Sequence, residues 1–187
     1  MSILTRVKLF WLIFFLLPVN LIAQFLPRDI TSGKFYYSEE VLVKDGPQQD
    51  LYHRAKSWFA SLGQNKKTLR QDDSVNGMVI GDIRSIISVF DGHQNQKFKL
   101  GYTVHVQLTD DRYWLSLTDF QLQNLSLLKE SGSAKETPIN NQPLEAWLKP
   151  QSQVNLKDKE PIYMKGLENA VYKSIFTQLK DLKAHML

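Results

Sequence analysis

The sequence predicts an α+β domain in which a curved antiparallel β-sheet carries two amphipathic helices on one face. Three observations indicate this architecture. Apolar and polar residues alternate with a period of two between residues 98 and 118, whereas residues 48–62 and 161–185 place their apolar residues three or four positions apart. Strands that are apolar on one side need a covering layer on that side, and the helices carry matching apolar stripes. We expect the other face to stay open.

The segment 1–23 has the pattern of a secretory signal peptide. Arg6 and Lys8 precede an apolar run from Leu9 to Leu17, and Ala23 supplies a small residue at the end. We expect cleavage near Ala23 and a periplasmic or secreted product. The alternative is an N-terminal anchor in the inner membrane, although the run is shorter than the roughly 20 apolar residues of a membrane-spanning helix.

The remaining length suits one domain over residues 35–187, preceded by a short lead-in over 24–34. The whole chain has a formal net charge of only +4, which argues against a nucleic-acid partner. It contains no cysteine, so packing alone must stabilise the fold outside the cytoplasm, and thiolate chemistry is excluded.

The first strand and helix follow the lead-in. The segment 35–43 is aromatic and β-branched, which predicts a strand. Asp45-Gly46-Pro47 is a turn that starts a helix, with Asp45 as its candidate cap. The helix over 48–62 is suited to end at Gly63. Its apolar stripe comprises Leu51, Ala55, Trp58, Phe59 and Leu62.

Antiparallel strands fill the middle of the chain. They are predicted over residues 68–72, 78–90, 98–108 and 113–125. Asn76-Gly77 predicts a tight turn between the first two strands, and Asp110-Asp111 turns the chain between the last two. Gly81 and a change of apolar phase after Ile83 suggest a bulge or a bend in the second strand, and the phase changes again near Asp119.

A polar crossover over 129–160 leads to the last helix over 161–185. Pro143 and Pro150 enclose one or two helical turns, in which Trp147 would attach the crossover to the body of the domain. The apolar set of the last helix is Met164, Leu167, Val171, Ile175, Leu179 and Leu182. Its polar side carries Lys165, Lys173, Lys180 and Lys183. These lysines indicate a solvated face, with an anionic surface as the alternative partner.

Three motifs resemble a known family. The segment 51–58 (LYHRAKSW) resembles its first-helix signature, and 72–81 (DDSVNGMVIG) is similar to its acidic hairpin and the strand that follows. Residues 102–107 and 110–114 resemble its paired strands with an Asp-x-Arg-Tyr turn, although Asp111 stands where the family usually has Gly. The family is a bacterial exported domain of unknown function with a TBP-like fold, domain-of-unknown-function family 4468.

This resemblance covers about residues 35–125. It implies a TBP-like fold and supplies no catalytic residues to transfer. The fold label does not imply DNA binding, because a fold does not determine a function.

The sequence offers no recognisable catalytic or metal-binding motif. The four histidines, His53, His93, His105 and His185, lack metal-ligand spacing. The segment beginning at Asp72 resembles a calcium loop, but Ile83 occupies the twelfth position, where a glutamate is required. Acidic pairs such as Asp72-Asp73 fall in predicted turns and are expected to be solvated. We expect neither a metal nor a cofactor.

The open sheet face is the candidate ligand-binding site. Its predicted residues are Thr103, His105 and Gln107 on one strand, and Trp114, Ser116 and Thr118 on the next. An exposed tryptophan among short polar groups can bind a sugar, a peptide or another protomer. Alternatively, Trp114 packs under the crossover or the lead-in.

The resulting hypothesis is an exported, non-catalytic binding or interaction domain of the cell envelope. Its expected partner is an unidentified peptide, glycan or envelope protein, with no nucleic acid and no stable membrane span after signal removal. One alternative is an enzyme with a non-motif active site, hydrolase-like, that uses His105 and a carboxylate. Another is a structural domain that forms a homodimer or larger oligomer.

Overall fold

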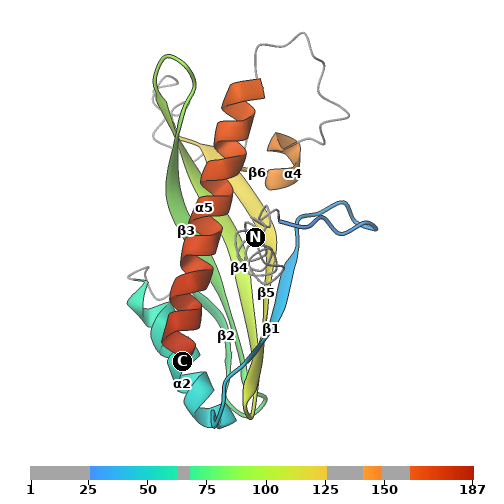
Figure 1. Ribbon diagram of the computed structural model, residues 1–187, viewed down its shortest axis with the longest axis vertical. Helices are drawn as coiled ribbons and strands as arrows, with labels where there is room; N and C mark the ends of the chain where they lie inside the picture. Colours follow the sequence, from blue (N-terminus) through green and yellow to red (C-terminus); the bar gives the residue numbers. More distant parts are fainter. Residues whose placement is uncertain (1–25, 63–67, 126–140, 149–160) are drawn as a thin grey trace, which may run out of the picture.

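The computed structural model describes residues 26–62, 68–125, 141–148 and 161–187 (Figure 1). The predicted signal peptide, the Gly63 cap and most of the polar crossover lie outside these residues. The described elements are β1 (Tyr37–Leu42), α2 (Gln48–Ser61), β2 (Leu69–Asp73), β3 (Met78–Phe90), β4 (Asn95–Thr109), β5 (Arg112–Asn124), β6 (Asn141–Pro143), α4 (Leu144–Trp147) and α5 (Pro161–Met186).

The strands form one antiparallel sheet in the order β1-β5-β4-β3-β2. β5 shares its outer edge between two short strands, because β1 pairs with residues 112–117 and β6 pairs with residues 121–123. The first strand of the sequence therefore lies beside the last long one. The three-residue β6 was not predicted.

Both long helices cover the same face of the sheet (Figure 1). The Ser174 hydroxyl of α5 lies 2.8 Å from the Ser85 hydroxyl of β3. Lys183 of α5 forms an ion pair with Glu39 of β1. In α4, the Trp147 ring packs edge-on against Phe98 of β4, with 5.5 Å between ring centroids. These contacts confirm the predicted α+β class with helices on one face.

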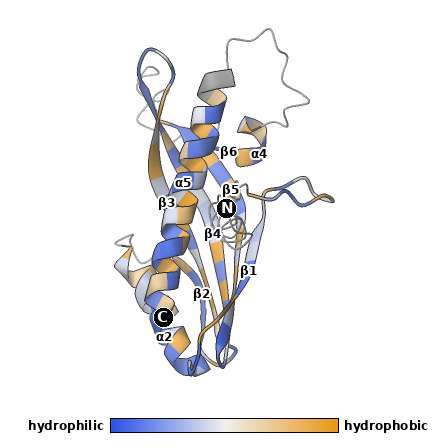
Figure 2. Ribbon diagram, viewed as in Figure 1, coloured by the Kyte–Doolittle hydropathy of each residue, from blue (hydrophilic) through white to orange (hydrophobic). Residues whose placement is uncertain are grey.

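The core lies between this helical layer and the sheet. Hydrophilic and hydrophobic residues are interleaved along α5 and the strands behind it (Figure 2). The predicted stripe of α2 is buried except for the partly buried Leu62, and the stripe of α5 is buried except for the partly buried Met164. On β4 the buried apolar set is Phe98, Leu100, Tyr102, Val104, Val106 and Leu108, as the alternation predicts.

Side chains of α2 contact the C-terminal end of α5 directly. The indole N–H of Trp58 donates to the Asp181 carboxylate across 2.8 Å. The guanidinium of Arg54 donates to the backbone carbonyls of Met186 at 2.8 Å and Leu187 at 2.9 Å. We call this set of contacts the α2–α5 clasp.

The bulge predicted inside β3 is wrong. The pairing of β3 with β4 runs without a shift from Met78 to Phe90. The irregularity lies instead in β2, between Leu69 and Gln71, and Leu69 pairs with Gly81. The structure leaves no room for a side chain at position 81, because a Cβ there would stand 2.6 Å from the Phe59 ring and 2.7 Å from the Thr68 carbonyl oxygen.

The change of apolar phase after Ile83 has a different cause. Ser85 faces the helices and meets Ser174, whereas Ile86 points to the open face and is 59% exposed. In the sequence, a polar residue on the covered side followed by an apolar residue on the open side looks the same as the change of alternation that a bulge produces.

The second predicted irregularity is confirmed at Asp119. Thr103 pairs with Thr118 and Gly101 pairs with Gln121, so β5 carries one extra residue. Asp119 adopts a left-handed φ of 54°, which turns Phe120 to the covered face. There the Phe120 ring stacks on Tyr102 with 5.4 Å between centroids.

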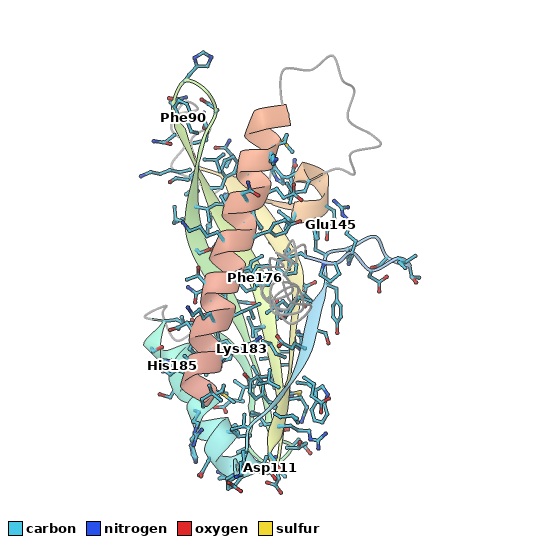
Figure 3. The ribbon with its side chains drawn as sticks, in the orientation of Figure 1. Phe90, Asp111, Glu145, Phe176, Lys183 and His185 are labelled. Carbon is cyan, nitrogen blue, oxygen red and sulfur yellow. The ribbon has the colours of Figure 1, made fainter. Side chains whose placement is uncertain are left out.

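The start of α2 differs from the prediction. Asp45 does not cap the helix, and Pro47 occupies the cap position without a side-chain hydrogen bond. The missing acceptor comes from the β4–β5 turn, where Asp110 accepts from the backbone N–H of Gln48 at 2.8 Å. Asp111, seen at the same end of the molecule in Figure 3, adopts a φ of 63°. The structure thus caps α2 from a distant turn.

Replacing Asp110 by alanine should therefore destabilise the domain by about 1 kcal/mol, the usual cost of a lost N-terminal cap. Urea unfolding measures the change. Asp45→Gly is the matched control, because glycine also tolerates a left-handed φ but has no side-chain acceptor, and its stability should stay within about 0.5 kcal/mol of the parent. The reverse ranking would restore Asp45 as the cap.

Candidate functional site: the open sheet face

The open face is organised as rows of side chains that run across the strands. The Trp114 row consists of the successive cross-strand partners Glu40, Trp114, Gln107, Met78 and Asp73. The His105 row beside it consists of Ser38, Ser116, His105, Ile80 and Gln71. Because directly opposite residues of an antiparallel pair share a face, each row spans five strands on one side of the sheet.

All six predicted site residues come together on this face. Thr103 pairs with Thr118, His105 with Ser116, and Gln107 with Trp114. Thr103, however, is only 2% exposed and donates its hydroxyl to Asp82 at 3.1 Å. It supports the sheet and offers no surface to a ligand.

Trp114 is the large aromatic group of the face. Its side chain is 40% exposed, so it is not packed away under the lead-in or the crossover. The Arg112 guanidinium lies 5.9 Å from the indole ring centroid and also forms a 2.9 Å ion pair with Glu40. Arg112 thereby lies beside the indole ring, which presents an apolar surface next to both charges.

The β2–β3 turn orders the opposite end of the Trp114 row. Gln107 donates its side-chain N–H to the Asn76 carbonyl oxygen at 2.7 Å. The side chain of Asn76, and then its backbone N–H, donate to Asp73 and hold the pKa of that carboxyl below its ordinary value. Asp73 is therefore a carboxylate at neutral pH, and the row ends in a negative charge.

His105 has no direct carboxylate partner among the residues that the structure describes. Its Nε2 lies 3.5 Å from the Thr118 hydroxyl, and that hydroxyl donates to Asp119 at 3.2 Å. The Thr118 hydroxyl thus lies between the imidazole and the Asp119 carboxylate. Within the same described ranges, no three potential metal ligands form a cluster.

The sequence interpretation missed Arg112, which lies beside the Trp114 row, and several residues of the two rows. Arg112 lies two positions before Trp114, so strand alternation could have found it. Glu40, Met78 and Asp73 come from other strands, and the β1–β5 pairing that brings Glu40 to Trp114 has no local sequence signal. The helices in the described part of the chain include none that is long and apolar enough to cross a membrane.

Comparison with known proteins agrees with this architecture. Residues 37–123 match the family model described as a domain of unknown function (DUF4468) with TBP-like fold. Over this stretch the chain is similar to the DUF4468 family. The stretch runs from β1 into β5, so the matched region contains all five strands that carry the Trp114 row. The resemblance inferred from the sequence motifs is confirmed.

Two solved structures show the same fold. A TBP-like protein from Parabacteroides distasonis ATCC 8503 superposes with a TM-score of 0.58 at 16% identity, covering 86% of this chain and 96% of that one. A DUF4468 family protein from Bacteroides ovatus ATCC 8483 gives a TM-score of 0.57 at 14% identity, with coverages of 84% and 89%. No curated protein matches the chain. The TBP-like fold is thus established.

Proposed function

We propose that this chain is an exported, non-catalytic interaction domain of the bacterial cell envelope that binds a peptide or a glycan on its open sheet face. The observation that carries the proposal is the half-exposed Trp114, held between Arg112 and the polar groups of its row. A rigid indole surface contributes apolar contact with little loss of conformational entropy. The neighbouring carboxylate and amide groups can hydrogen-bond the hydroxyls of a sugar or the backbone of a peptide.

Export is the second part of the proposal and is supported by the basic, apolar and small-residue pattern of residues 1–23. Sequencing the N-terminus of the protein recovered from a bacterial envelope fraction tests it. We expect the mature chain to begin near Gln24. Recovery of the uncleaved chain from the cytoplasmic fraction would contradict export.

Binding is tested by titrating the mature protein with two probe sets, soluble muropeptides and short extended peptides, while tryptophan fluorescence is recorded. We expect one set to bind, and Trp114→Ala to weaken that binding at least about tenfold, since central tryptophans dominate binding energies. Lys180→Ala on the helical side is the control and should bind as the parent does. Equal binding by Trp114→Ala, or no binding of either probe set, would remove Trp114 from the site.

A further inference from the structure

The outer edge of β3 is paired along only part of its length. β3 has 13 residues, and its pairing with β2 ends at Gly81, followed by a 2.7 Å hydrogen bond from the Asp82 N–H to the Thr68 carbonyl oxygen. Since backbone groups alternate in direction along a strand, Ile86, Ser88 and Phe90 also direct their N–H and C=O away from β4. Among the described residues, no strand pairs with β3 at these three positions.

The same stretch exposes apolar side chains. Ile86 is 59% and Phe90 is 60% exposed on the open face, with the exposed Ser88 between them. In Figure 3, Phe90 lies close to the tip of the β3–β4 hairpin, at the margin of the molecule. In Figure 1, α5 lies inward from this part of β3. An edge that no described strand pairs with, with exposed apolar groups and no lysine or proline at these positions, is a template for strand addition.

We propose that two copies of this chain associate edge to edge through antiparallel pairing of their β3 strands, about a two-fold axis at Ser88. In this register Ser88 faces the partner's Ser88, and Ile86 faces the partner's Phe90. All three positions direct their backbone groups outward, so each becomes a hydrogen-bonded pair. The result is one continuous sheet across both copies.

A second copy fits this edge because the edge is self-complementary. A two-fold axis at Ser88 pairs aliphatic Ile86 with aromatic Phe90 twice, which is a favourable cross-strand combination, and sets the short serines opposite each other at the centre. A single paired edge is smaller than a standard interface, so we expect a dissociation constant in about the micromolar range. This dimer goes beyond the proposed ligand binding and does not use the Trp114 row.

Sedimentation equilibrium of the mature protein tests the dimer, and charge exchange tests its register. We expect Ile86→Lys and Phe90→Glu each to weaken self-association at least about tenfold, because each places a charge against an apolar partner. An equimolar mixture of the two variants should associate again. In the mixed pair, the introduced lysine faces the introduced glutamate, and the second contact remains isoleucine against phenylalanine.

Two further variants keep the test specific. Ser88→Pro removes a central outward N–H without touching the β3–β4 bonds, so it should abolish association and leave circular dichroism unchanged. Leu42→Lys alters an equally exposed apolar residue, 70% exposed on β1, and should leave association intact. A protein that is monomeric at about 1 mM, or a dimer that survives Ile86→Lys and Ser88→Pro, would overturn the proposal.

Discussion

Replacing Gly81 by alanine should destabilise the domain by about 1–3 kcal/mol, which is the usual cost of forcing a methyl group into a packed core. The added Cβ would stand 2.6 Å from the Phe59 ring and 2.7 Å from the Thr68 carbonyl oxygen, and the second of these atoms belongs to the backbone. The substitution must therefore push β2 or α2 away from β3. Urea unfolding monitored by circular dichroism measures the loss.

Gly101→Ala is the matched control for this experiment. Gly101 also lies inside a long strand, but the nearest atom to its added Cβ is the Ile83 carbonyl oxygen at 3.9 Å. Glycine within a strand costs about 0.5–1 kcal/mol relative to alanine, so this variant should be neutral or slightly more stable than the parent. Equal destabilisation of both variants would show that strand position, and not the contact with α2, decides the effect.

Replacing Trp58 by alanine should cost about 3–5 kcal/mol, the range for removing a large aromatic side chain from a core. Trp58 is among the largest fully buried side chains, and it packs edge-on against Phe59 at 4.9 Å. The substitution also leaves Asp181 without its indole partner. Because the loss approaches the whole stability of a typical domain, part of the variant population should be unfolded without denaturant.

Asp181→Asn separates the hydrogen bond from the packing. Asparagine retains a side-chain oxygen that accepts from the indole N–H, so its stability should fall by no more than about 1 kcal/mol. Calorimetric unfolding of both variants gives the comparison. A loss below about 1 kcal/mol for Trp58→Ala would mean that the α2–α5 clasp contributes little to the stability of the fold.

Regular periodicity made most of the fold predictable. Residues 98–108 alternate without interruption and form β4, and the two helices begin where their apolar stripes indicate. The bulge at Asp119 was also detectable in the sequence, because one extra residue reverses the apolar and polar alternation of every residue after it. These features are local, so a single sequence contains them.

The features that were missed depend on contacts between distant segments. The cap of α2 comes from Asp110, more than sixty positions away, and local rules therefore selected Asp45. β6 has three polar or proline residues and no apolar pattern, and it lies beside the buried Leu144 of α4. In β3, Ser85 and Ile86 reverse the usual distribution of polar and apolar residues, so pattern reasoning placed a bulge there.

The candidate site was partly predictable for the same reasons. Alternation along β4 and β5 placed the six residues on one face, and their register brings them together. Alternation cannot show that Thr103 is shielded by its neighbours, nor that β1 brings Glu40 to Arg112. Exposure and cross-strand neighbours are properties of the assembled sheet.

The α2–α5 clasp also bears on when the domain can finish folding. Trp58 and Asp181 are separated by 123 positions, and the acceptors of Arg54 are the backbone carbonyls of residues 186 and 187. During synthesis the apolar stripe of α2 can pack against β3 and β4 before α5 is made. The clasp itself can form only after residues 181–187 have been made, and contacts between such distant residues slow folding.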